Sequence, residues 1–386
     1  MIAKIQLPRI IAQGGGSLAD LPQILAQLGL ARPFVVTDPF LATSGLLSGL
    51  TDMLTLSGLE YGLFTRTVAD PTTGVIEDAV AAFRDTSCDC VIGFGGGSPI
   101  DTAKAIAVLA RHDIPYSALK VPAQIDVPGF PVIAIPTTAG TGSEATRFTI
   151  ITHEATGEKM LCAGLGFLPI AAIVDYELTM GMPRRLTADT GIDSLTHAIE
   201  AYVSRRANPF SDVMALSAMQ LIAANIRTAC AEPDSRAARE AMMTGAHQAG
   251  LAFSNASVAL VHGMSRPVGA LFHVPHGLSN AMLLPAVTRF SAASALERYA
   301  ECARACAFAE EDEGDQAAVS RLNDALEQLN HDLDVPTPAR YGIDEAAWHD
   351  NIPLMARQAI ESGSPANNPR VPGADEIEAL YREVWR

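Results

Sequence analysis

A run of three glycines between an apolar segment and a helix-like segment constrains the fold of this chain more than any other feature. Residues 90–107 are CVIGFGGGSPIDTAKAIA, whose apolar start is typical of a buried strand. Further strands are predicted at 33–38 and 130–138. Helices are predicted at 78–85 and 100–110. Strands that alternate with helices form a parallel sheet with crossover helices, so we expect an α/β domain in the first half of the chain.

The second half of the chain has a different pattern. From about residue 184 onward, long periodic runs rich in Ala and Leu, such as SDVMALSAMQLIAANI, replace the alternation of strands and helices. This periodicity predicts an all-helical domain. We therefore expect an α/β domain over residues 1–184 and a helical domain over 185–386, with the boundary in MGMPRRLT (180–187).

Composition narrows the class of protein. The 386 residues allow two or three domains, and 48% hydrophobic with 18% charged residues is typical of a well-packed soluble protein. The formal net charge of −16 argues against nucleic acids and anionic membrane surfaces as partners. The N-terminus lacks the pattern of a secretory signal, and no uninterrupted apolar run reaches the roughly 18 residues of a spanning helix. The six cysteines show no CxxC spacing, so reduced thiols and a cytoplasmic location are expected.

The glycine turn is a candidate phosphate site. Ser98 is expected to cap the helix, with Pro99 at the first helical position and Asp101 completing a capping box. Glycines let the backbone approach a ligand, and free N–H groups at a helix start attract an anion, so a diphosphate is the expected guest. The pattern is not GxGxxG, and a tight turn that binds no ligand also fits it.

Two further features point to a dinucleotide. Residues 136–146, PTTAGTGSEAT, follow a predicted strand and are rich in hydroxyl and N–H donors. Asp38 ends the strand predicted at 33–38, where a carboxylate can bind an adenosine ribose hydroxyl and repel a 2′-phosphate. NAD is therefore expected rather than NADP, although Asp38 is equally suited to capping the next helix.

Four side chains have the composition of a transition-metal site. Asp193 and His197 are four residues apart in a helical run and so share one face. His262 and His276 can add two nitrogens. One oxygen and three nitrogens without a thiolate suit Fe(II), Zn or Mn better than Ca or Mg.

Other interpretations of these residues remain open from spacing alone. Asp189 or Glu200 lies on nearly the same helix face and can take the place of Asp193. A histidine in an apolar run is also more often a hydrogen-bonded core residue than a metal ligand.

The motifs together resemble those of the iron-containing alcohol dehydrogenase family. The matching runs are, in order, GFGGGSPIDTAKA, PTTAGTGSEAT, GIDSLTHAIEAY, and HGM followed fourteen residues later by PHG. The resemblance extends over nearly the whole chain, from PRIIAQGGGSLADLP to NNPRVPGADEIEALY. It implies the fold shared with dehydroquinate synthases: an α/β dinucleotide-binding domain, an all-helical domain, and an active site in the cleft between them.

The resemblance also implies roles for individual residues. It implies NAD(H)-linked interconversion of a small primary alcohol and its aldehyde, with Fe(II), or alternatively Zn, as the metal. The implied metal ligands are Asp193, His197, His262 and His276. The implied cofactor-binding residues are Asp70, Gly95, Gly96, Gly97, Ser98, Thr137, Thr138, Thr141, Ser143, Lys159 and Leu178, and the local sequence pattern adds Asp38 and Asp101.

Two residues depart from the family pattern. Asp70 stands where many members have an asparagine near the cofactor. Arg266 stands four residues after His262, where many members have a histidine sometimes given a proton-transfer role. A guanidinium does not release its proton at working pH, so a proton relay falls to water, ribose hydroxyls or His273.

Arg266 also bears on the substrate class. If the run is helical, Arg266 shares a face with His262, and Pro267 is expected to end or kink the helix. A guanidinium binds an anionic group as a fork, so we expect a small anionic semialdehyde and its hydroxy acid as a substrate pair. The alternative is that Arg266 pairs with a local carboxylate or with the cofactor diphosphate.

The same sequence features leave several other functions open. Glycerol dehydrogenases and other polyol or lactaldehyde oxidoreductases are alternatives with the same fold. A metal-dependent hydrolase and a catalytically silent NAD-binding protein are alternatives of a different class. A homodimer or larger homo-oligomer is expected, because residues 2–10, IAKIQLPRI, have the pattern of an edge strand that can pair with a second chain.

Overall fold

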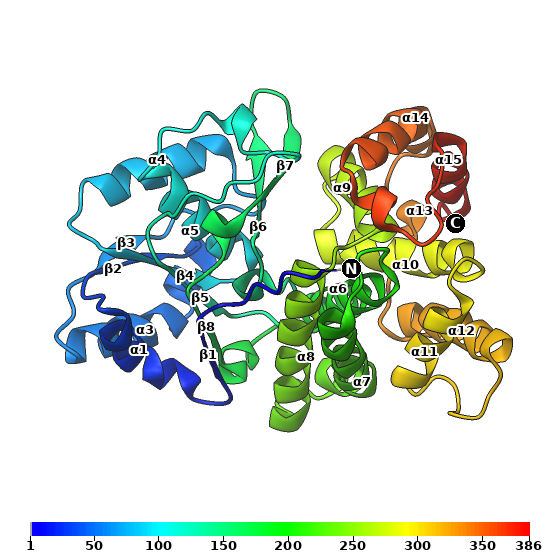
Figure 1. Cartoon of the computed structure of the whole chain (residues 1–386), viewed down its shortest axis with the longest axis horizontal. Coiled ribbons are helices and arrows are strands. Elements are labelled where there is room, and N and C mark those ends of the chain that lie inside the picture. Colours follow the sequence, from blue (N-terminus) through cyan, green and yellow to red (C-terminus); the bar gives the residue numbers. More distant parts are fainter. Residues whose placement is uncertain (1) are drawn as a thin grey trace. The chain divides into compact units, whose positions relative to one another are not determined.

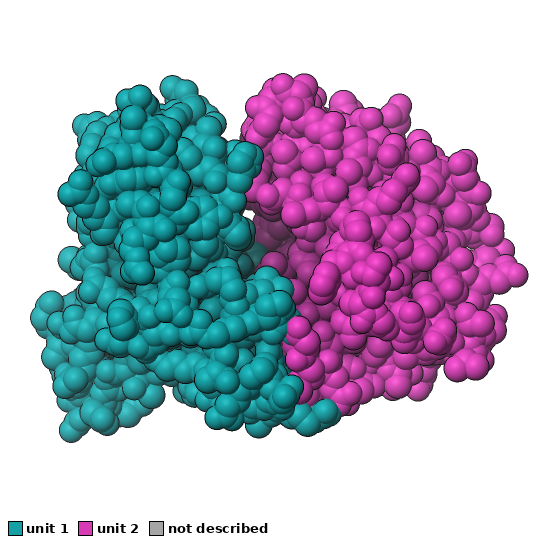
Figure 2. Space-filling model, turned by 180° about the vertical axis from the view of Figure 1, so that it is seen from behind, with its two compact units in different colours: residues 1–5, 182–386 teal, residues 6–181 magenta. Residues whose placement is uncertain are grey.

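The computed structural model describes residues 2–386, which form two compact units. Residues 6–181 make up one unit, and residues 2–5 together with 182–386 make up the other (Figure 2). All strands of the described chain lie in the unit of residues 6–181 (magenta in Figure 2), and the other unit consists of helices and loops. The predicted fold class, an α/β part followed by an all-helical part, is confirmed.

A six-stranded parallel sheet forms the centre of the α/β unit (Figure 1). A separate pair of antiparallel strands follows the fifth strand of the chain. The strands of the large sheet, in spatial order, are β1 (Ile10–Gln13), β8 (Ala171–Val174), β5 (Val132–Pro136), β4 (Cys90–Gly95), β2 (Pro33–Val36) and β3 (Gly62–Phe64). The antiparallel pair is β6 (Phe148–His153) and β7 (Glu158–Ala163).

Helices cover both faces of the large sheet. Val91 of β4 belongs to an apolar cluster that includes residues of α4 and α5, whereas its neighbour Ile92 belongs to a second cluster that includes residues of α1 and α3. Strands buried on both faces are apolar at successive positions, which explains the uninterrupted run CVIGF. The helices of this unit are α1 (Leu21–Leu28), α2 (Pro39–Thr43), α3 (Leu46–Leu56), α4 (Thr73–Arg84) and α5 (Gly97–Leu109).

The helical unit is built around α6 (Arg184–Val203), which packs against α7, α8 and α10. Nearly every residue of α6 from Thr187 onward is buried, including several polar ones. Because buried polar groups need partners, this helix is the natural place to look for a site. The other helices of the unit are α7 (Pro209–Ala231), α8 (Arg236–Asn255), α9 (Leu260–Phe272), α10 (His276–Ala292), α11 (Leu296–Ala305), α12 (Asp315–Asp332), α13 (Pro338–Tyr341), α14 (Glu345–Glu361) and α15 (Ala374–Glu383).

One described helix, α7, is long and apolar enough by length and composition alone to cross a membrane. The sequence has no uninterrupted apolar run of that length, because polar residues such as Asp212 and Arg227 divide it. The helix packs against α6 and α8, as the core helix of a helical domain does. It is therefore weak support for a membrane span.

The predicted cap of α5 is wrong. The helix begins at Gly97, and its N-cap is Gly96, which offers no side chain. Ser98 is therefore already inside the helix, and Asp101 forms no capping box because its carboxylate accepts hydrogen bonds from Ser143 and Ile150. Hydrogen bonds to residues distant in the sequence therefore take the place of the local capping bonds that the sequence pattern predicted.

One further prediction about local structure is wrong. The N-terminal run 2–10 is not a strand along its length, because β1 begins only at Ile10, although β1 does lie at an edge of the sheet. Pro267, predicted to end or kink its helix, does not end α9, which continues to Phe272, and the kink stays a prediction. None of the six cysteines is in a disulfide, in agreement with the expected free thiols.

Candidate functional site

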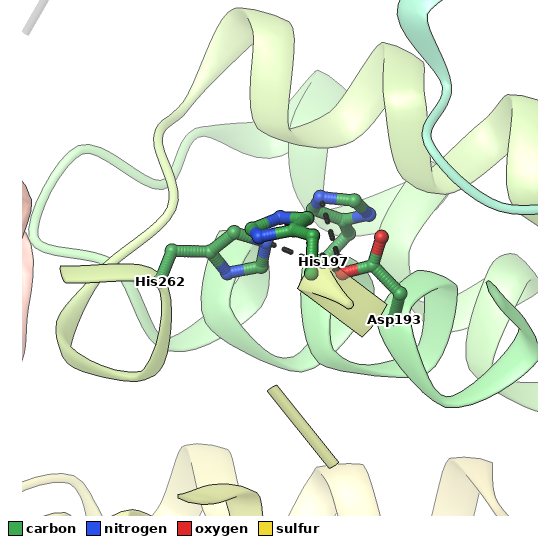
Figure 3. Close-up of side chains that lie close together, drawn as sticks. Asp193, His197 and His262 are labelled. Carbon is green, nitrogen blue, oxygen red and sulfur yellow. Dashed lines mark ion pairs between the residues drawn. The ribbon is translucent and has the colours of Figure 1, made fainter. Parts of the chain in front are cut away.

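Four side chains of the helical unit converge on one point. Asp193 and His197 come from α6, His262 from α9, and His276 is the first residue of α10. One ligand atom from each lies within 4.8 Å of the others. Figure 3 shows the carboxylate of Asp193 pointing toward the imidazole rings of His197 and His262. Asp193, His197 and His262 are buried, whereas the side chain of His276 is 42% exposed.

The distances within this cluster suit a metal ion. The Oδ1 atom of Asp193 lies 3.5 Å from Nε2 of His262 and 3.9 Å from Nε2 of both His197 and His276. Ligand atoms about 2.1 Å from one tetrahedral ion are separated from one another by roughly 3.4 Å. The observed separations are slightly larger, and one oxygen with three imidazole nitrogens is a donor set that Fe(II), Zn and Mn accept. The residues therefore fit a divalent transition metal.

The charges of the cluster affect two pKa values in opposite directions. Burial acts to raise the pKa of Asp193, but the nearby imidazoles of His197, His276 and His262 hold that pKa well below its usual value. Burial acts to lower the pKa of His262, but the carboxylates of Glu200 and Asp193 raise it to about 9. The cluster thus favours an ionised Asp193 beside a positively charged group.

Gly277 allows α10 to begin directly against α6. A Cβ atom at Gly277 would lie 2.4 Å from the backbone oxygen of Asp189, closer than any side chain tolerates. This close approach brings the preceding residue, His276, to Asp193. The His-Gly pair at 276–277 therefore has a packing reason.

Glu200 orients His262, a role that sequence reasoning missed. Its buried carboxylate accepts hydrogen bonds from Nδ1 of His262 at 2.6 Å and from the backbone N–H groups of Ala259 and Val261 at 2.9 and 2.6 Å. A carboxylate on Nδ1 leaves Nε2 of the imidazole free to face the cluster. The sequence offered Glu200 only as a substitute ligand, and its position seven residues after Asp193 on a buried helix was the available signal.

Asn280 is a second residue that sequence reasoning missed. It lies one turn after His276 on α10 and is fully buried. Its Nδ2 atom donates to Oδ1 of Asp193 at 2.7 Å and lies 3.2 and 3.3 Å from Nε2 of His262 and His276. Asn280 therefore holds the carboxylate of Asp193 in place.

Two predicted or alternative site residues lie outside the cluster. His273 is exposed and ends α9 in the left-handed conformation, with φ of 55°. Asp189 forms an ion pair with Arg185 on the same helix, so it does not take the place of Asp193.

Arg266 lies one turn after His262 on α9, as the spacing predicted. Its guanidinium is half-buried and donates to Oγ of Ser364 at 2.9 Å. No ion pair with a carboxylate of the described residues involves Arg266. Burial lowers the pKa of Arg266 to about 10, against the opposing charge of Glu200, so the group stays protonated at neutral pH.

The glycine turn of the α/β unit is closely packed. A Cβ atom at Gly97 would lie 3.0 Å from the side chain of Thr141, so glycine lets the loop 137–146 approach the start of α5. The backbone N–H of Thr137 donates to the oxygen of Gly95 at 3.0 Å, and Thr138 lies beside Gly96. The structure therefore brings the two predicted cofactor loops together.

Several predicted cofactor residues make contacts within the protein. Asp38 caps α2 by accepting from the N–H of Leu41 at 2.9 Å. Asp70 and Lys159 form an ion pair at 2.8 Å. Leu178 is buried in the core cluster beside the sheet.

Family models match both units of the chain. The model described as "Iron-containing alcohol dehydrogenase" matches residues 8–176, and the model described as "Fe-containing alcohol dehydrogenase family, C-terminal" matches residues 187–385. The chain is 40% identical to long-chain-alcohol dehydrogenase 1 of Geobacillus thermodenitrificans, over 100% of this chain and 97% of that protein.

Solved structures agree with the family models. A crystal structure of 1,3-propanediol oxidoreductase superposes with a TM-score of 0.95 at 33% identity and covers 100% of both chains. The structure of sulfoacetaldehyde reductase from Bifidobacterium kashiwanohense with NAD+ gives a TM-score of 0.89 at 29% identity, over 100% of this chain and 99% of that one. The chain therefore belongs to the iron-containing alcohol dehydrogenase family and is an oxidoreductase that interconverts alcohols and aldehydes.

Proposed function

We propose that this enzyme uses NAD(H) and Fe(II) to interconvert a small primary alcohol and its aldehyde. The observation that carries the proposal is the convergence of Asp193, His197, His262 and His276 in a chain that also has two glycine-rich cofactor loops. The test is oxidation of NADH, followed at 340 nm, by Fe(II)-loaded protein with a panel of aldehydes. Absence of turnover with every aldehyde would leave a hydrolase or a silent NAD-binding protein as the better account.

The helical unit supplies the metal site. A divalent ion held by Asp193, His197, His262 and His276 would act as a Lewis acid on the oxygen of the alcohol or aldehyde. Glu200 and Asn280 hold His262 and Asp193 in the positions from which they would bind this ion. His276 is the exposed member of the set, so the site is open to solvent on its side. Zn is the proposed substitute metal, because the same donor set accepts it.

The α/β unit supplies the cofactor site. The N–H groups at the start of α5 would hold the diphosphate of NAD, whose nicotinamide carries the hydride. The carboxylate of Asp38 uses one oxygen to cap α2, which leaves the other to accept from a ribose hydroxyl. Lys159 and Asp70, joined as an ion pair, lie on the same unit.

Asp38 is expected to set the preference for NADH over NADPH. Replacing Asp38 with Ser keeps a helix cap but removes a charge that repels a 2′-phosphate. The kcat/KM ratio of NADPH to NADH should rise by about fivefold or more, which corresponds to roughly 1 kcal/mol. Asp38→Gly, which also eliminates the charge, should shift the ratio in the same direction. A wild-type enzyme that reacts faster with NADPH than with NADH would contradict this assignment.

Arg266 is proposed to select an anionic substrate. It lies one turn from His262, carries a positive charge, and pairs with no carboxylate of the described residues. A structural relative is named for sulfoacetaldehyde, an anionic aldehyde, which supports a semialdehyde as the substrate here.

The Arg266 proposal predicts a change in selectivity. In Arg266→Ala, the ratio of kcat/KM for an anionic aldehyde to that for a neutral aldehyde of equal length should fall by about tenfold or more, because a charge-assisted fork is lost. Arg266→Lys keeps the charge without the fork, so its ratio should lie between those of the wild type and Arg266→Ala. A ratio that is equal in wild type and Arg266→Ala would remove Arg266 from substrate choice.

We also propose a cytoplasmic homodimer or larger homo-oligomer. The strand β1 lies at an edge of the sheet, and the side chains of Ile2, Ile5 and Leu7 before it are exposed. An edge strand with exposed apolar neighbours favours pairing with a second chain. A monomeric mass by light scattering at micromolar concentration would contradict the oligomer. The free cysteines support the cytoplasm, which cell fractionation tests.

A further inference from the structure

A lysine with no access to solvent lies in the middle of α5. The side chain of Lys104 is 0% exposed, although a lysine is almost never fully buried unless it is paired. Its Nζ atom donates to Oγ of Ser143 at 2.9 Å, Oγ1 of Thr146 at 3.1 Å and the backbone oxygen of Phe148 at 2.8 Å. An ammonium group has three N–H donors, so these bonds use all of them.

The carboxylate of Asp101 completes this buried network. It accepts from the hydroxyl of Ser143 at 2.6 Å and from the N–H of Ile150 at 2.9 Å. Ser143 therefore donates to Asp101 and accepts from Lys104, both on α5. Burial lowers the pKa of Lys104 to about 8, although the charges of Asp101 and Glu144 act to raise it.

The network fixes one end of the second cofactor loop, residues 137–146. The other end is fixed by the N–H of Thr137, which donates to the oxygen of Gly95. Between the two ends, Thr141 lies against Gly97, and Gly142 takes a left-handed conformation with φ of 61°. The loop is thus held at both ends against the glycine turn and the start of α5.

We propose that Lys104 is a positioning residue for the cofactor: it holds the loop 137–146 at the distance from the glycine turn that NAD(H) requires, without touching the cofactor. This inference rests on the proposed binding of NAD(H) to these loops. It also gives Asp101 and Ser143 a role other than the predicted direct contact with the cofactor, because Ser143 accepts from Lys104 and donates to Asp101.

Two variants separate loop positioning from general stability. Lys104→Met removes all three N–H donors but keeps an unbranched side chain of similar length. Thr146→Val removes one acceptor and keeps the shape of a buried residue. Thr146→Val is the milder substitution, so it remains informative if Lys104→Met does not fold.

The experiment is a titration of each protein with NADH in the absence of aldehyde, followed by nucleotide fluorescence, with Tm measured in parallel. We expect the Kd for NADH to rise by about tenfold or more in Lys104→Met and by about twofold to fivefold in Thr146→Val, since charge-assisted hydrogen bonds are lost. Metal content of both variants should equal that of the wild type.

A double-mutant cycle with Ser143→Ala tests the mechanism. If Lys104 acts through the loop, the double variant should raise the Kd by less than the product of the fold changes caused by Lys104→Met and Ser143→Ala alone. The inference is overturned if folded Lys104→Met binds NADH like the wild type, if Thr146→Val with wild-type Tm shows no change, or if the two effects multiply. Wild-type protein that does not bind NADH would instead overturn the proposed function.

Discussion

Replacing His262 with Ala is expected to abolish turnover while the protein stays folded. The change removes one of the four residues proposed to hold the metal, and loss of Lewis-acid assistance worth several kcal/mol would lower the rate by about a thousandfold or more. His276→Ala should have a similar effect on turnover, with less effect on stability because His276 is exposed. The measurements are kcat for aldehyde reduction, metal per chain by elemental analysis, and Tm.

A histidine outside the cluster provides the matched control. His331 lies on α12 with its side chain 84% exposed, and His331→Ala should keep both metal and turnover. If His262→Ala and His276→Ala retain most of their metal and activity, the metal site lies elsewhere in the chain.

Replacing Glu200 with Gln is expected to weaken metal binding although Glu200 is not a ligand. A carboxylate accepts the proton on Nδ1 of His262 and leaves Nε2 for the metal, whereas an amide can donate to Nδ1 and favour the wrong tautomer. Residues that orient a ligand in this way typically contribute about 10- to 100-fold to metal affinity. The measurement is competition with a chromophoric chelator at a pH above about 9, where protons no longer compete with the metal for His262, and at a temperature well below Tm.

The number of protons released on metal binding provides a second test of the role of Glu200. The pKa of His262 is raised to about 9, so at pH 7 this imidazole is protonated before the metal binds and must release its proton. Metal affinity should therefore fall as the pH falls below about 9. Glu200→Gln removes a charge that raises this pKa, so fewer protons should be released on metal uptake near neutral pH. Equal affinity and equal proton release in the two proteins would contradict the role of Glu200.

The sequence predicted the fold class because both signals are local. The run CVIGF and the helical periodicity after residue 184 each follow from burial of one segment, and the structure confirms both kinds of element. The strand order β1-β8-β5-β4-β2-β3 depends on how crossovers return to the sheet, which no local pattern records. The same limit explains the wrong prediction for Ser98. Ser98 has the local sequence pattern of a helix cap, but Gly96 is the N-cap of α5, and Asp101 accepts from the distant residue Ser143.

The sequence predicts a residue of the candidate site only where its distance along the chain from another site residue, or the motif around it, is informative. Asp193 and His197 share a helix face by their separation, whereas His262 and His276 are indicated by the resemblance of their His-Gly motifs to those of the family. Asn280 carries no such mark, because an asparagine in a helix is ordinarily a surface residue, and the spacing of Glu200 from Asp193 does not distinguish a metal ligand from a residue that orients one. Only the packing of α6, α9 and α10 shows that both are buried beside the cluster.

Titration of metal-free enzyme with Fe(II) under anaerobic conditions shows whether aldehyde reduction depends on one bound metal ion per chain. The protein is stripped with a chelator, and NADH-dependent aldehyde reduction is measured after each addition of Fe(II). Activity is expected to rise from near zero and to level off at one ion per chain, and His262→Ala should show no such rise. Stripped protein that reduces aldehydes as fast as the Fe(II)-loaded protein would contradict it.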